Sequence, residues 1–78
     1  MAKSKIIASP AILFGKPTIA GTRIAVEQIL ASLCQDWTHA KIKKEFDISD
    51  ADIRACMDFA YHSVSRTHFV NTSGKAYA

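Results

Sequence analysis

Two cysteines and two histidines are the side chains of this sequence best suited to bind a metal ion. Cys34 and His39 are separated by four residues, and Cys56 and His62 by five. These spacings do not match the ligand pairs of structural zinc sites, and both cysteines fall on the apolar faces of predicted helices. The sequence therefore predicts no metal site and two buried free thiols, as is usual in a reducing cytoplasm.

A second candidate for chemistry is the segment Gly15–Thr18, GKPT, which superficially resembles a phosphate-binding loop. That motif needs glycine, four residues and then Gly-Lys-Ser/Thr at the start of a helix. Here the next glycine, Gly21, is followed by threonine and arginine, so no nucleotide site is predicted. No nucleophile with a base and an orienting acid can be assembled, and the histidines His39, His62 and His68 are interpreted as surface residues. We therefore expect neither a cofactor nor enzymatic activity.

The charges are distributed unevenly along the chain, whose formal net charge is +3. Residues 1–44 contain seven basic and two acidic side chains, whereas residues 45–58 contain five acidic side chains and one basic side chain, Arg54. A basic surface attracts phosphate and an acidic one repels it, so the N-terminal part is the part expected to meet nucleic acid. The alternative is a solvated surface on which charges cluster by chance.

Length and composition indicate one small domain that associates with something else. A chain of 78 residues buries only about 60–65% of the surface that its unfolded form exposes. With 49% hydrophobic residues, a dimer or a stable partner is favoured. No segment approaches the ~18–20 apolar residues of a membrane span, and Ile6–Phe14 is not interpreted as a signal peptide. We expect a soluble, cytoplasmic protein.

The segment Gly15–Val26 contains two glycines and a proline and leads into the first helical pattern. Its glycines permit positive φ and Pro17 fixes its own φ, which predicts a turn, a strand, a tight reversal and a second short strand over Thr18–Ile24. Together with the β-prone residues before it, this forms a predicted arm, Lys5–Ile24. The edges of such a hairpin pair within one chain or with another chain.

Three amphipathic helices are predicted after the arm. The first spans about Ala25–Gln35 and ends at Asp36, the second runs from the N-cap Thr38 to about Phe46, and the third starts at the N-cap Ser49 with Asp52 in a capping box. The inner face of the first helix comprises Val26, Ile29, Leu30, Leu33 and Trp37. The inner face of the third comprises Ile53, Cys56, Met57, Ala60, Tyr61 and Val64. The predicted fold is mostly α, with a three-helix helix-turn-helix core and a short N-terminal β-hairpin.

A helix-turn-helix raises the question of DNA binding, because its second helix is the one that enters the major groove. The outward face of that helix would carry Ala51, Arg54, Ala55, Asp58 and His62. Only Arg54 could read a base there, and the aspartates at positions 50 and 52 would repel phosphate. A scaffold role for the motif is therefore favoured over groove reading, which stays open. Further DNA contacts are expected from Lys16, Arg23, Lys41, Lys43 and Lys44.

The segment from Ile6 to Tyr61 resembles the domain-of-unknown-function 433 family. The family pattern Gly-Lys/Arg-Pro-x-Ile-x-Gly-Thr-Arg-Ile-x-Val is matched at Gly15, Lys16, Pro17, Ile19, Gly21, Thr22, Arg23, Ile24 and Val26. The resemblance implies a homeodomain-like helix-turn-helix with a short N-terminal β element. It also implies a VapB-like antitoxin that binds and silences a PIN-like nuclease toxin and helps to repress its own operon as a dimer.

We accordingly predict an antitoxin-like binding module of a toxin–antitoxin system, with a domain over residues 1–65 and a partly disordered tail over 66–78. The tail is the predicted toxin-binding segment, through Arg66, Phe69, Val70 and Tyr77. Two alternatives are a DNA-binding regulator without a toxin partner and a purely structural interaction protein.

Overall fold

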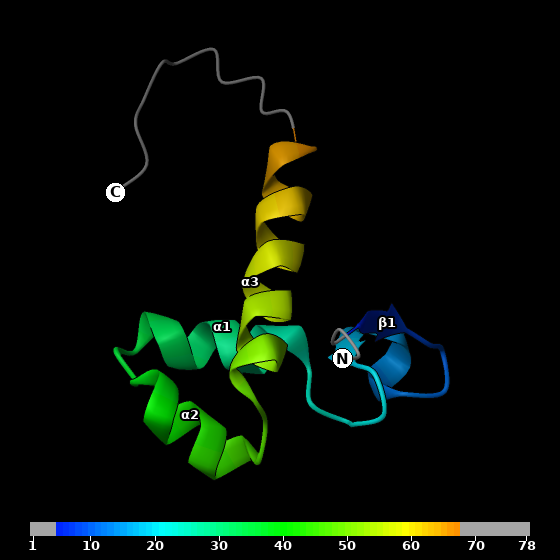
Figure 1. Cartoon of the computed structure of the whole chain (residues 1–78). Coiled ribbons are helices and arrows are strands. Elements are labelled where there is room, and N and C mark those ends of the chain that lie inside the picture. Colours follow the sequence, from blue (N-terminus) through cyan, green and yellow to red (C-terminus); the bar gives the residue numbers. More distant parts are fainter. Residues whose placement is uncertain (1–4, 68–78) are drawn as a thin grey trace, which may run out of the picture.

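Three helices follow an N-terminal β-hairpin, in the predicted order. The structure, a computed structural model, describes residues 5–67. Its elements are β1 (Ile6–Ala8), the short 3-10 helix η1 (Leu13–Gly15), β2 (Pro17–Ile19), α1 (Val26–Cys34), α2 (His39–Phe46) and α3 (Asp50–Ser65) (Figure 1). The two strands form one antiparallel sheet. The predicted mostly α fold with an N-terminal hairpin is confirmed.

The helix ends lie where short polar side chains predict them. Asp36 follows α1 with a φ of 64°, and Asp47 ends α2 with a φ of 55°, a left-handed conformation that Asp tolerates better than most residues. Thr38 Oγ1 accepts a hydrogen bond from the Lys41 backbone N–H at 3.1 Å and so caps α2. Ser49 caps α3 in the same way. These local interactions leave three residues, 47–49, between α2 and α3.

One cluster of buried apolar side chains joins the β arm to all three helices. It consists of Ile19, Val26, Ile29, Ile42, Ile53 and Cys56. Leu30, Leu33 and Trp37 are partly buried against it, which confirms the predicted inner face of α1. Each large side chain buried in this way contributes about 1.5–3 kcal/mol. The arm and the helices therefore share a single core.

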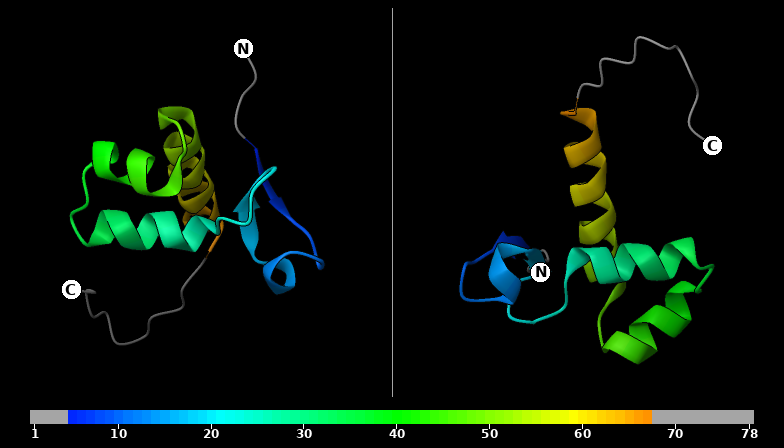
Figure 2. Two further views of the ribbon diagram at one scale, coloured as in Figure 1. Left: turned by 90° about the horizontal axis from the view of Figure 1, so that it is seen from below. Right: turned by 180° about the vertical axis from the view of Figure 1, so that it is seen from behind.

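The helix α3 is longer than the layer on which it packs. It has 16 residues, whereas α1 has nine, and its C-terminal half extends beyond the other two helices (Figures 1 and 2). The predicted inner face is correct for Ile53 and Cys56, which are fully buried, but Met57, Tyr61 and Val64 are 41%, 67% and 68% exposed. Hydrophobic spacing marks one face of a helix without showing how far a neighbour covers that face. Burial of these three side chains was wrongly predicted.

The hairpin pairs differently from the prediction. β2 lies antiparallel to β1, with Ile6 opposite Ile19, so the arm pairs within the chain. The predicted second strand of Thr18–Ile24 does not form; among the described residues, the reversal leads only to an isolated bridge between Thr18 and Ala25.

The side chain of Thr22 explains the missing strand. Its Oγ1 donates a hydrogen bond to the Ile19 carbonyl at 2.7 Å and accepts one from the Ile24 N–H at 3.0 Å. Threonine side chains that bond to nearby backbone compete with regular strand pairing. The segment therefore stays a turn.

Candidate partner-binding surfaces

Within residues 5–67, the turn formed by η1 has the most unusual backbone. Leu13, Phe14 and Gly15 all have positive φ, at 48°, 56° and 85°. A bulky L-residue in this region costs about 1–2 kcal/mol, and Phe14 gains nothing by burial because its side chain is fully exposed. Strained backbone of this kind is found disproportionately at functional sites. The turn presents an aromatic side chain to solvent at a cost to stability.

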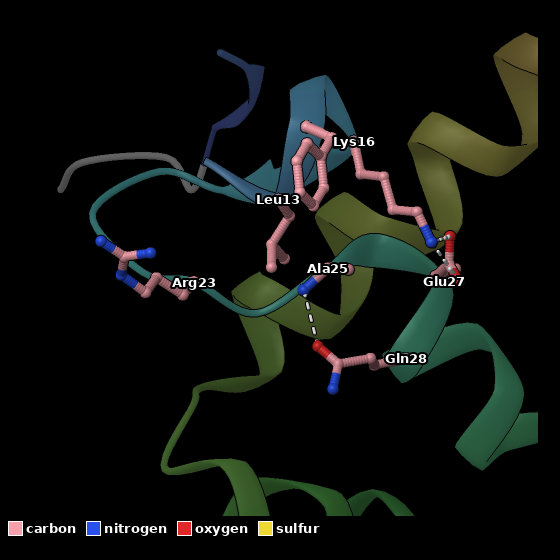
Figure 3. A pocket seen from close by; sticks show the side chains of 7 residues that line it. Leu13, Lys16, Arg23, Ala25, Glu27 and Gln28 are labelled. Atoms are coloured by element: carbon pink, nitrogen blue, oxygen red, sulfur yellow. Dashed lines mark hydrogen bonds and ion pairs between the residues drawn. The ribbon is translucent and has the colours of Figure 1, made fainter. Parts of the chain in front are cut away.

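An open cavity of about 310 Å³ adjoins this turn (Figure 3). It is lined by Leu13, Phe14, Lys16, Arg23, Ala25, Glu27 and Gln28. On one side, Lys16 Nζ lies 3.2 Å from Glu27 Oε1. Figure 3 shows Arg23 on the opposite side of the cavity, and no ion pair to Arg23 is found within residues 5–67. This arrangement can bind an apolar group together with a carboxylate or phosphate.

The predicted nucleic-acid-binding residues fall in two places. Lys16 and Arg23 flank the cavity beside η1, whereas Lys41, Lys43 and Lys44 lie on α2 and Arg54 lies on α3. Lys16 and Lys43 are engaged in ion pairs, and Lys41 Nζ lies 4.0 Å from the centroid of the Trp37 ring. Arg23, Lys44 and Arg54 are exposed, and within the described part of the chain they form no ion pair. Of the six predicted nucleic-acid-binding residues, these three are the ones available to a ligand.

The start of α3 should repel phosphate less than its two aspartates alone would indicate. Lys43 Nζ lies 3.0 Å from Asp50 Oδ2, and His39 Nδ1 lies 3.9 Å from Asp50 Oδ1. Four of the five residues predicted to face outward from α3 are exposed: Ala51, Arg54, Asp58 and His62. The fifth, Ala55, is half-buried.

A depression of about 370 Å³ on this face is lined by His39, Asp50, Ala51, Arg54 and Met57.

The predicted toxin-binding residues are only partly within the structure. Arg66 is exposed, and its Nε donates a hydrogen bond to the His62 carbonyl at 3.3 Å. Phe69, Val70 and Tyr77 lie outside the described residues, so the tail stays a prediction.

Sequence reasoning missed an apolar surface on the part of α3 that projects beyond the core. An open groove of about 340 Å³ separates this part of α3 from α1 and β2. Its apolar lining comprises Pro17, Val26, Leu30, Phe59, Ala60 and Val64. The signal was present in the sequence as a helical apolar stripe, but it was assigned to the core.

The two cysteines have different environments. Cys56 is buried as predicted, and desolvation by burial, with a smaller contribution from the Asp52 carboxylate, raises the pKa of its thiol to about 11. Cys34 is exposed, contrary to the prediction. It follows Leu33 by one residue, and one step of about 100° around a helix carries it off the buried stripe.

Residues 5–67 contain no cluster of three or more His, Cys, Asp or Glu side chains placed to hold a metal ion. Over the same range, no helix is both long and apolar enough to cross a membrane.

Comparison with known proteins identifies a family but no characterised relative. The family model described as "Protein of unknown function (DUF433)" matches residues 6–60. No curated protein and no solved structure matches the chain. Because the matched segment covers well over half of the 78 residues and includes the Gly15–Val26 stretch, the chain belongs to the DUF433 family.

Proposed function

We propose that this protein is an antitoxin-like binding module that neutralises a PIN-like nuclease toxin in the cytoplasm and acts as a homodimer. The partner class comes from the resemblance of Gly15–Val26 and the following helices to the domain-of-unknown-function 433 family, which implies a VapB-like antitoxin. The structure supports a role in binding through the exposed aromatic side chain of Phe14 on a strained turn. Its work is to hold a partner and not to transform a substrate.

Phe14 has the properties of an anchor for a protein partner. Aromatic side chains and arginine are enriched among the residues that dominate binding energy at interfaces. Here Phe14 lines one cavity together with the apolar Leu13 and with Arg23, which forms no ion pair within residues 5–67. A partner could insert an apolar group against Phe14 and Leu13 and place a neighbouring carboxylate against Arg23. Contact with Phe14 would also offset the cost of its exposure.

The test begins with the gene neighbourhood, where a PIN-like reading frame beside this gene is expected. The nuclease encoded there is co-expressed with the tagged protein and captured. Phe14→Asn and Arg23→Ala should each weaken capture by about tenfold or more, because interface anchors lose at least that much on truncation. Lys44→Ala, an exposed cation on α2, serves as the control and should leave capture unchanged. Equal capture by all variants would refute the role of the η1 cavity.

The C-terminal tail is a second proposed contact with the toxin. Its residues Phe69, Val70 and Tyr77 supply apolar groups that fold on contact, and Arg66 could approach an acidic nuclease site. Truncation after Ser65 should preserve the helical circular dichroism spectrum and abolish capture of the nuclease. Unchanged affinity of the truncated protein would remove the tail from the interface.

DNA binding is the second candidate function, either alone or as operon autoregulation beside toxin binding. It is favoured by the three-residue separation of α2 and α3 and by the ion pair that Lys43 forms with Asp50. Each phosphate contact steepens the slope of log affinity against log salt by about 0.9. Fluorescence anisotropy with upstream DNA at several salt concentrations measures this slope. An absent or salt-insensitive signal would exclude this function.

A further inference from the structure

Four acidic and basic side chains form a regular row on the exposed face of α3. Asp50, Arg54, Asp58 and His62 follow one another at intervals of four residues, and all four are exposed. Their character alternates acid, base, acid, base. Reversing the row about its midpoint, Cys56, exchanges every acid for a base. This charge row is therefore complementary to a reversed copy of itself.

The two central members of the charge row are not used within the described chain. Neither Arg54 nor Asp58 takes part in an ion pair within residues 5–67, although each has an opposite charge four residues away. Asp50 already contacts Lys43 and His39, so the outer pairs of the row add less than the central ones. The strongest complementarity is thus centred between Arg54 and Asp58.

From this complementarity we infer that two copies of the protein associate through antiparallel α3 helices. Arg54 of each copy then lies opposite Asp58 of the other, and Asp50 lies opposite His62. Rows of residues four apart are the ridges that pack together in the commonest class of helix contact, at a crossing angle of about 50°.

The apolar residues of the same face support the same register. Met57 lies at the centre of the pairing, 41% exposed in the single chain. The register brings Tyr61 of one copy to the level of Ala51 of the other, where the depression of about 370 Å³ lies. The exposed aromatic side chain of Tyr61 is thus brought to a hollow that Asp50 and Arg54 of the partner copy's charge row help to line. Burial of Met57 and Tyr61 provides the gain that surface ion pairs alone do not.

This inference rests on the dimeric state proposed above and is independent of the toxin. Such a dimer would restrict how the protein could bind DNA. The contact covers Arg54 and the outward face of α3, so a dimer of this kind cannot insert that face into the major groove. Its DNA contacts would come from Arg23 and Lys44.

The test is a mixing experiment with two charge-reversal variants, Arg54→Asp and Asp58→Arg. Each variant alone places like charges opposite each other twice, so sedimentation velocity should show dimerisation weakened by about tenfold or more. An equimolar mixture should recover a heterodimer, because each central contact then joins an aspartate of the first variant to an arginine of the second. Circular dichroism verifies that each variant folds, and Lys44→Asp is the control that should dimerise like the wild type.

Recovery on mixing separates this contact from a stabilising role inside one helix, since charges within a chain cannot be restored by a second chain. A monomeric wild-type protein at concentrations up to about 1 mM would overturn the inference, and so would a mixture that stays as weak as its components. Nuclease capture by the single variants reports on the proposed function separately. Retained capture by a monomeric variant would leave that function standing.

Discussion

Ser49 and Asp52 bind each other's backbone at the first turn of α3. Ser49 Oγ accepts a hydrogen bond from the Asp52 N–H at 3.2 Å, and Asp52 Oδ2 accepts one from the Ser49 N–H at 3.0 Å. The Asp52 N–H also donates to the Ser49 carbonyl at 3.1 Å, whereas the Ser49 N–H is satisfied by the carboxylate, which lies at the positive end of the helix dipole. This pair fixes where α3 begins and hence which of its residues enter the core.

Ser49→Ala should lower the free energy of unfolding by about 1 kcal/mol, since the replacement removes one side of this reciprocal cap. Urea unfolding followed by circular dichroism measures the change. Ser63→Ala, an exposed position later in the same helix, is the matched control and should be neutral or slightly stabilising, because alanine has the higher helix propensity. Equal effects at the two positions would show that the cap contributes nothing.

The two cysteines should differ in reactivity toward maleimide near pH 8, because the reactive species is an accessible thiolate. Cys34 is exposed and should be labelled in the native protein. Cys56 is buried with a raised thiol pKa and should be labelled only after unfolding. Peptide mass spectrometry identifies the labelled residue. Native Cys34→Ser should take up no label, and rapid labelling of that variant would contradict the burial of Cys56.

The raised pKa of Cys56 also predicts a dependence of stability on alkaline pH. Its ordinary value of 9.0 rises to about 11 in the folded chain, so folding favours the neutral thiol. This contribution is fully present below pH 9.0 and is lost as the pH rises toward about 11. The stability difference between wild type and Cys56→Ala should therefore shrink over that interval. A constant difference in urea unfolding from neutral to alkaline pH would contradict it.

Thr18→Val should stabilise the fold. The Thr18 side chain is fully buried, and its Oγ1 has no hydrogen-bond partner within residues 5–67. Removing an unsatisfied buried hydroxyl while keeping the shape is worth about 1 kcal/mol. Thermal unfolding should show a higher midpoint. Thr22→Val provides the opposite case, since the Thr22 hydroxyl makes two hydrogen bonds, and it should lower the midpoint.

Phe14→Asn should leave the stability unchanged or raise it by about 1 kcal/mol, although it removes an aromatic side chain. Asparagine tolerates the left-handed conformation of this position better than phenylalanine, and the exposed ring has no buried contacts to lose. Phe14→Leu keeps a bulky residue there and should match the wild type. Urea unfolding decides between these outcomes, and a marked loss of stability in Phe14→Asn would mean that the ring packs in solution.

Much of the fold is predictable because its signals are local. Thr38 and Ser49 accept hydrogen bonds from backbone groups three residues away, and Asp36 itself adopts the left-handed conformation, so helix ends follow from the local residue types. The buried stripe of α1 follows from periodicity, because its neighbours cover it along its length. The same periodicity failed at Tyr61 and Val64, since cover there depends on how two helices of unequal length cross.

The candidate site was predictable only in part. Arg23 and Lys16 stand out as cations in a glycine-punctuated stretch, but the ion pair of Lys16 with Glu27 joins residues 11 positions apart. The positive φ of Leu13 and Phe14 has no sequence signature, because these residue types rarely adopt it. The structure is therefore needed to show that Arg23 is the available cation and that Phe14 is the exposed aromatic residue.

The C-terminal half of α3 extends beyond α1 and α2, so the two halves of this helix differ in local stability. Its first half is held by the core, so opening it requires breaking tertiary contacts, whereas its second half is held mainly by its own backbone hydrogen bonds. The distal turns can thus fray while the domain stays folded. A molecule that binds these distal turns must offset the conformational entropy that is lost when they become ordered. Binding there would therefore change the order of the end of α3.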